Sequence, residues 1–371
     1  MIKIMRFFPN NFISPSEVAN SEMRNNVSFK SHLSQALYFI RGIAIVFVII
    51  GHVIGDDKNN GMRKMYSSDI VGLTWLSDFI YTFHMPVFLM VSGVAFAVFS
   101  NKNISYLEFM QSKLKRILLP LICWAPPFFL FHSLSQGKQF SFIDIIKAVI
   151  FPYSMFWFLH ALIFASIFSF CFFKFFKSPY LYLLISIFLF FISLFFQELF
   201  ISFYFHFNIF YALGVFIAHY LPQIHLVLGR LSLIFISVIS SFCILTMIAV
   251  KQFMVANYQS IIPIINGIIA FAFLYIAIDT YKIRFSFKSK NQILQFIKNN
   301  ILYAGKMSMV IYLFHMYFAT ITRIFLVKGF SSTEPSLHFI LGCSTAYLGP
   351  IILYKLLQKR SRAFRYSIGE G

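Results

Sequence analysis

Apolar stretches of membrane-crossing length recur along the chain from residue 37 to residue 357, and short polar joints separate them. A helix of roughly 20 apolar residues crosses the ~30 Å hydrocarbon core of a bilayer. The pattern therefore predicts an all-α, polytopic transmembrane bundle of about ten spans. The ten stretches are Leu37–Ile54, Phe79–Phe99, Ile117–Phe131, Phe156–Phe173, Tyr180–Phe196, Phe203–Tyr220, Leu231–Val250, Ile261–Ile278, Ile301–Val327 and Leu337–Leu357.

The composition is that of a membrane protein and not of a soluble domain. Hydrophobic residues make up 59% of the 371 positions, charged residues only 12%, and phenylalanine alone occupies 52. Soluble globular domains do not reach such values. The four cysteines lie in or beside apolar stretches and lack the spacing of a disulfide framework or a metal site, so we expect neither disulfides nor a bound metal.

The net charge of +19 comes from basic residues at the ends of the apolar stretches. They are not gathered with aromatic residues on a soluble face, so nucleic acid is not an expected partner. With the N-terminus assigned to the cytoplasm, 23 of the 31 Lys and Arg residues fall on the cytoplasmic side and the other 8 on the opposite side. This asymmetry predicts an even number of spans, with the N-terminus and the C-terminus both inside.

Three parts of the chain follow from this topology. Residues 1–35 are expected to form a cytoplasmic N-terminal tail, 36–358 a membrane domain, and 359–371 a basic cytoplasmic C-terminal tail. The first part contains polar and proline-bearing stretches and no small-residue cleavage site. We therefore interpret it as a retained tail and not as a secretory signal.

The first apolar stretch carries two polar residues, Arg41 and His52, with ten residues between them. Eleven steps of an α-helix turn roughly 1100°, about 20° past three full turns, and rise about 16 Å. Both heads should therefore lie on one stripe of the helix and face one common space. An arginine inside a membrane helix costs about 2.5 to 3.5 kcal/mol on insertion scales, so we expect Arg41 to face a protein cavity or an aqueous path.

Further candidates stand in the next two stretches. The second stretch runs inward in the predicted topology, which brings His84 close to the depth of His52. Lys113, Lys115 and Arg116 form a basic cluster at the cytoplasmic mouth of the third stretch. Lys113 and Arg116 are one helical turn apart, so together they could bind a polyphosphate.

These residues lie in segments that resemble the integral-membrane acyltransferase 3 family, which includes bacterial sugar O-acetyltransferases. In the family, the arginine-ten-histidine pair and an arginine-x-x-arginine motif after the second span are regarded as functional. Lys113 stands at the first arginine of that motif, which keeps the charge but loses the guanidinium fork. The matching segments are LYFIRGIAIVFVIIGH at 37–52, FHMPVFLMVSG at 83–93, SKLKRILLP at 112–120, WFLHAL at 157–162 and SMVIYLFH at 308–315.

The resemblance implies that 36–358 is a membrane acyltransferase domain. It would transfer an acyl group, most simply acetyl, from cytoplasmic acetyl-CoA to a hydroxyl of a cell-envelope or exported glycan. The implied location is a bacterial inner membrane, and the implied partners are the lipid bilayer, acyl-CoA and the glycan acceptor. No metal is implied.

The residues fit this task. Arg41, Lys113, Lys115 and Arg116 supply cations for the CoA phosphates on the side where CoA exists. His52 would be the general base that accepts the proton of the attacking hydroxyl, with His84 and Arg41 assisting.

Two points of mechanism stay open. Asp56 follows His52 by four residues and could orient it, unless the helix has ended by Gly55. The acyl group could pass directly to the acceptor, or it could first rest covalently on Ser92 or a histidine.

Simpler interpretations exist for each site residue. Arg41 could be a positive-inside anchor, and the basic cluster could only mark a cytoplasmic helix end. His84, two residues before Pro86, could cap a local backbone break.

For the whole protein, the alternative is a membrane transporter or flippase of a lipid-linked sugar or small solute, and a third class is a structural membrane protein. Proton-coupled carriers commonly place Asp or Glu deep in the membrane. Here the acidic residues nearest to spans, Asp78, Glu198 and Asp279, stand at the ends of the stretches. The pattern therefore favours the enzyme.

Overall fold

The computed structural model describes residues 15–66, 70–100, 104–252, 261–284 and 292–370, and this part of the chain is helical, with no strand. The all-α prediction is confirmed for these residues. A π-helical turn, η1 (Leu114–Leu118), joins α4 to α5, and a 3₁₀ turn, η2 (Ser154–Phe156), precedes α7. The α-helices are α1 (Pro15–Ile54), α2 (Val71–Tyr81), α3 (His84–Phe99), α4 (Tyr106–Lys113), α5 (Leu119–Ser135), α6 (Phe142–Ile150), α7 (Trp157–Phe175), α8 (Pro179–Phe195), α9 (Phe200–Ala218), α10 (Leu221–Arg230), α11 (Leu233–Gln252), α12 (Ile262–Arg284), α13 (Gln292–Lys306), α14 (Ser308–Phe330), α15 (Pro335–Leu357) and α16 (Arg362–Ser367).

Within the described residues, seven helical segments are long and apolar enough to cross a membrane. Three further apolar helices are shorter. Every predicted stretch overlaps one of these ten segments, whereas the number of true spans and the N-in, C-in orientation stay predictions. The seven are Phe29–Ile54, Val71–Phe99, Tyr106–Ser135, Phe142–Phe175, Phe200–Ala218, Ser308–Phe330 and Pro335–Leu357, and the three are Pro179–Phe195, Ile234–Val250 and Ile262–Ile278.

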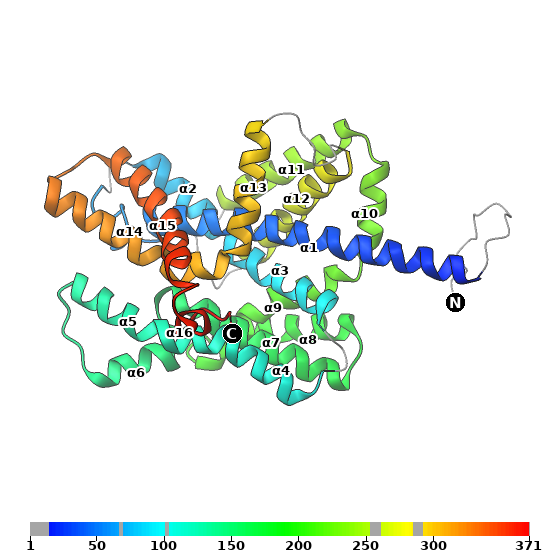
Figure 1. The fold of residues 1–371 in the computed structure, drawn as a ribbon, viewed down its shortest axis with the longest axis horizontal. Coiled ribbons are helices and arrows are strands. Elements are labelled where there is room, and N and C mark those ends of the chain that lie inside the picture. The colour runs from blue at the N-terminus through cyan, green and yellow to red at the C-terminus, as the bar shows by residue number, and fades with distance from the viewer. Residues whose placement is uncertain (1–14, 67–69, 101–103, 253–260, 285–291, 371) are drawn as a thin grey trace.

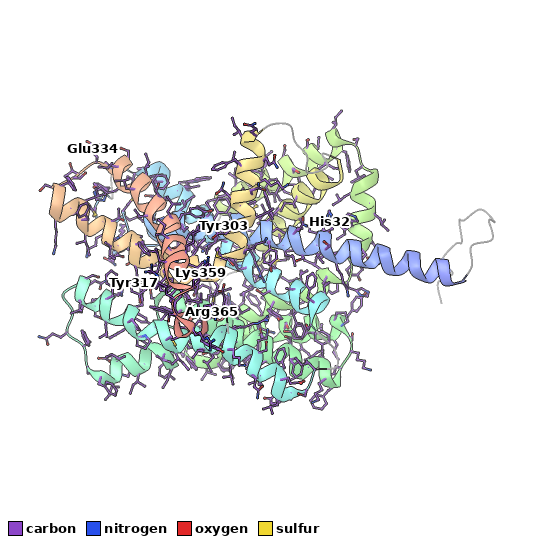
Figure 2. The ribbon with its side chains drawn as sticks, viewed as in Figure 1. His32, Tyr303, Tyr317, Glu334, Lys359 and Arg365 are labelled. Carbon is purple, nitrogen blue, oxygen red and sulfur yellow. The ribbon has the colours of Figure 1, made fainter. Side chains whose placement is uncertain are left out.

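Helix α1 runs through the bundle along its long axis (Figure 1). It packs against α2, α3, α12, α13, α14 and α15. Figure 2 shows His32 of α1 and Glu334, which precedes α15, towards opposite ends of the molecule. The membrane-length parts of α1 and α15 therefore run in opposite directions.

Glycines let α3 pack directly on α9. A Cβ at Gly93 would stand 2.1 Å from the carbonyl oxygen of Tyr211, and one at Gly214 would stand 2.0 Å from that of Met90. Any side chain at either position would force the helices apart, as at other small-residue contacts between membrane helices. The contact fixes α3, and with it the histidine at its first position.

The last described residues fold back onto the bundle. Helix α16 packs against α5, where the indole Nε1 of Trp124 donates to the carbonyl oxygen of Ser367 over 3.0 Å. Phe364 and Ile368 are buried. Residues 362–370, predicted as part of a basic tail, are thus a packed element of the fold.

Candidate active site

Two cavities lie along the C-terminal half of α1, one at its end and one nearer its middle. The first, which we call the histidine cavity, has a volume of about 950 Å³, and its lining includes His52, His84, His132 and Arg323. The second, the basic cavity, has a volume of about 960 Å³, and its lining includes Arg41, Lys113, Arg116 and Lys306. The imidazoles thus line the first cavity, whereas the cations predicted to bind the donor line the second.

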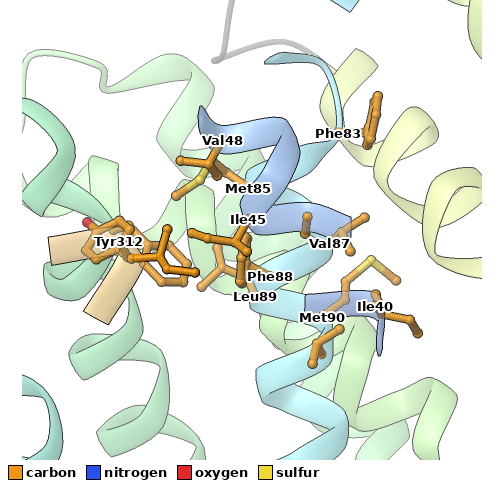
Figure 3. Close-up of a cluster of buried hydrophobic side chains, with 14 of the residues drawn as sticks. Ile40, Ile45, Val48, Phe83, Met85, Val87, Phe88, Leu89, Met90 and Tyr312 are labelled. Carbon is orange, nitrogen blue, oxygen red and sulfur yellow. The ribbon is translucent and has the colours of Figure 1, made fainter. Parts of the chain in front are cut away.

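The prediction that Arg41 and His52 face one common space is wrong, because the two residues line different cavities. Their helix stripe is shared, but α3 and α14 pack against α1 between the two levels. Met85 and Tyr312 line both cavities, so these two side chains stand where the cavities adjoin. Figure 3 shows both in a buried apolar cluster with Ile45 of α1.

His52 lies two residues before the end of α1, at the histidine cavity. Its Nδ1 is 3.1 Å from the hydroxyl of Tyr81, a hydrogen-bonding distance. Asp56 does not orient it: the helix ends at Ile54, and the Asp56 carboxylate accepts instead from the side-chain amide of Asn60 over 2.8 Å. The sequence pattern does not single out Tyr81, although its spacing of three residues before His84 is a helical one.

His84 lines the same cavity as His52, so the structure brings the two predicted histidines together. It opens α3 directly after the break that ends α2 at Tyr81. Its Nδ1 donates to the carbonyl oxygen of Ile80 over 2.8 Å, and its ring packs edge-on against Tyr81 with centroids 4.9 Å apart. His84 therefore does cap a backbone break, as the simpler interpretation holds, while also facing the cavity.

His315 of α14 is a third histidine at this place. Its ring centroid is 5.2 Å from that of His52, and the side chain is fully buried. Nδ1 lies 2.8 Å from the carbonyl oxygen of Tyr312 and 3.1 Å from that of Ile311. Carbonyls only accept, so Nδ1 carries the hydrogen and the neutral ring has a lone pair at Nε2.

That Nε2 is buried and has no hydrogen-bond partner among the described residues. Unsatisfied buried polar atoms are few in native structures, and each calls for a reason. The segment SMVIYLFH, which ends at His315, is the sequence signal for this position. The bonds at Nδ1 explain the ring's orientation but not the unpaired nitrogen.

The basic cavity brings together three of the four residues predicted to bind the donor. Arg41, Lys113 and Arg116 line it, and Lys306 of α13 joins them. Lys115 is exposed and is not part of the lining, because its side chain leaves the helix on another face.

The local backbone and the lining charge suit an anion. Lys113 ends α4, and Arg116 lies in the π-helical turn η1, a distortion often found at functional sites. Glu370, in the segment after α16, is the one acidic side chain among the described lining residues, and it accepts from the hydroxyl of Tyr354 over 2.9 Å. The cavity therefore holds four Lys or Arg side chains against one carboxylate.

Ser92, the candidate for a covalent intermediate, lines the basic cavity and not the histidine cavity. Its hydroxyl donates to the carbonyl oxygen of Phe88 over 2.9 Å. The described contacts of Ser92 include no base that could activate it.

A family model described as an acyltransferase domain matches residues 35–355, which include the lining of both cavities apart from Ser34 and the three residues 368–370 of the basic cavity. No curated protein and no solved structure matches the chain.

Proposed function

The chain belongs to the acyltransferase 3 family, and from this premise we propose that it is a membrane-bound O-acyltransferase that takes acetyl from cytoplasmic acetyl-CoA and gives it to a hydroxyl of a cell-envelope or exported glycan. Membership of the family supports the transfer of an acyl group. The proposal adds the donor, the acceptor and the bacterial inner membrane as the place of the reaction.

The observation that carries the proposal is the meeting of a cationic cavity and a histidine cavity at Met85 and Tyr312. Acetyl-CoA is a long molecule with its phosphates at one end and its thioester at the other. Arg41 and Arg116 would hold the phosphates by charge-assisted hydrogen bonds. The thioester end would then be free to extend towards Met85 and Tyr312.

The chemistry then needs a base beside the acceptor hydroxyl. His52 takes the proton from the hydroxyl, the oxygen forms a bond to the thioester carbonyl carbon, and the carbon–sulfur bond breaks. The CoA thiolate leaves and receives the proton that His52 carries. In this reaction Nε2 of His52 is the working atom, so Nδ1 carries the hydrogen and donates it to the oxygen of Tyr81, which orients the ring.

Direct transfer fits the arrangement better than a serine intermediate. Ser92 and His52 line different cavities, and the Ser92 hydroxyl is engaged with its own helix. A covalent acetyl-histidine keeps the same residue in the centre of the reaction. Incubating the protein with labelled acetyl-CoA and no acceptor distinguishes the two routes, because only a covalent route leaves label on the protein.

The test of the function compares envelope glycans from cells that make the wild type, the variant His52→Ala, or no protein. We expect mass spectrometry to show a species heavier by one acetyl group only with the wild type. His219→Ala, outside both cavities, is the control and should retain it. A glycan mass unchanged in all strains, with altered distribution across the membrane, would favour the transporter instead.

A further inference from the structure

An arginine stands in the histidine cavity at some distance from the histidines. Arg323 of α14 is half-buried and lines this cavity. Within the described part of the chain, no ion pair or hydrogen bond joins its guanidinium to another residue. Arg63 shows the contrast, since its guanidinium pairs with Asp78 and donates to the carbonyl oxygen of Thr74 over 2.8 Å.

The rest of the lining does not neutralise Arg323. Lys64 and Lys328 add positive charge, and Asp56 is the one acidic side chain among the described lining residues. That carboxylate is exposed, accepts from Asn60 and forms no ion pair with Arg323 within the described part of the chain. A guanidinium withdrawn from water without a counter-charge is unfavourable, and an anion entering the cavity relieves this.

His132 of α5 also lines this cavity, and its imidazole is already engaged. Its Nδ1 lies 2.7 Å from the hydroxyl of Tyr153, and its Nε2 lies 2.7 Å from the side-chain amide of Gln136. These bonds hold His132 as part of the wall. Arg323 is therefore a half-buried cation of the wall with free donors for a ligand.

The position of Arg323 along α14 sets a distance. It follows His315 by eight residues, and eight residues of α-helix rise about 12 Å. His315 packs against His52, so the guanidinium stem leaves the helix about 12 Å further along its axis than the reacting level. Between them, Met316, Ala319 and Thr320 line the same cavity.

We propose that the histidine cavity takes an acceptor that carries an anionic group, a phosphate or a carboxylate, and that this group is bound by Arg323, whose side chain leaves α14 about 12 Å along the helix from the level of His315. The planar fork of arginine matches both anions with two parallel hydrogen bonds. The inference rests on the proposed function, because it takes the occupant of this cavity to be the acyl acceptor. It adds that a neutral sugar without an anionic group is a poor acyl acceptor.

The first experiment measures binding without any transfer. The full chain in a neutral detergent is heated with increasing glucose 1-phosphate, glucuronate or glucose, and the rise in Tm gives the half-saturating concentration. We expect both anions to raise Tm and glucose not to. A lower half-saturating concentration for glucose 1-phosphate identifies a phosphate-bearing acceptor, and a lower one for glucuronate identifies an acidic sugar.

Variants connect the effect to Arg323. In Arg323→Met the half-saturating concentration of the anion should rise at least tenfold. In Arg323→Lys it should rise less, because lysine keeps the positive charge but lacks the planar guanidinium. Arg360→Met removes an exposed arginine outside both cavities and should leave the value unchanged. Unchanged acetyl-CoA binding in each variant shows that the fold and the basic cavity persist.

Three results would overturn the inference: equal shifts with glucose and glucose 1-phosphate, an anion effect that survives Arg323→Met, or displacement of glucose 1-phosphate by phosphatidylglycerol added to the micelles. The last would make the occupant a bilayer lipid. Arg323-dependent binding in a protein that acetylates no envelope glycan would instead overturn the proposed function, so the two failures are distinct.

Discussion

The hydroxyl of Tyr81 lies 3.1 Å from Nδ1 of His52 and comes from a different helix. This contact replaces the carboxylate that commonly orients a catalytic imidazole. A phenol holds the ring without adding a negative charge next to it. His52 and Tyr81 therefore form the pair on which the proposed base depends.

Tyr81→Phe should lower kcat for acetyl transfer about tenfold, with little change in the KM for acetyl-CoA, because it removes the group that fixes the His52 tautomer and no donor contact. Steady-state kinetics with labelled acetyl-CoA measure this. Tyr106→Phe, an exposed position, is the control. A Tyr81→Phe variant with wild-type kcat would show that His52 needs no such partner.

His315→Gln should reduce transfer at least tenfold while acetyl-CoA still binds, because the unpaired Nε2 beside His52 is lost. His160→Gln offers a matched comparison. Its Nε2 is also buried without a hydrogen-bond partner among the described residues, whereas His315 is the one whose ring packs against His52. Equal losses in both variants would mean that buried histidines serve only packing.

Arg116→Glu should raise the KM for acetyl-CoA at least tenfold, because charge-assisted bonds contribute about 1.5 to 3 kcal/mol each and reversal adds repulsion. Lys115→Glu makes the same charge change one residue away, outside the basic cavity, and should have a much smaller effect. The ratio of the two KM values tests the cavity itself. Similar KM values in the two variants would mean that the basic cluster only marks the end of a helix and does not bind the donor.

Met85→Trp should abolish transfer and spare donor binding, because a larger side chain where the cavities adjoin keeps the thioester from the hydroxyl. Equilibrium binding of labelled acetyl-CoA and the transfer assay, run on the same preparation, separate the two effects. Wild-type transfer by Met85→Trp would place the reaction elsewhere.

Local features of this fold could be predicted from the sequence, since they depend on neighbours along the chain. The apolar stretches became helices, and the eleven-residue spacing of Arg41 and His52 placed both on one helix stripe. Boundaries were less certain: the predicted stretch Ile301–Val327 contains the end of α13 at Lys306 and the start of α14 at Ser308. Gly305 and Lys306 are the sequence signals for that turn, and the apolar residues on both sides of them hid it.

The candidate site was predicted only in part, because its shape depends on which helices pack together. Met85 and Tyr312 come from α3 and α14 and divide a space that α1 alone leaves open. Tyr81 and His315 both contact His52, and neither contact has a sequence signal of its own. The return of α16 to the basic cavity likewise follows from packing against Trp124.

The division of the interior at Met85 and Tyr312 also concerns the bilayer that the proposed enzyme would occupy. A continuous wet path from one side to the other would let protons run down their gradient and drain the energy that the cell stores there. Two side chains that part only for a two-carbon cargo would keep the membrane electrically sealed during every turnover.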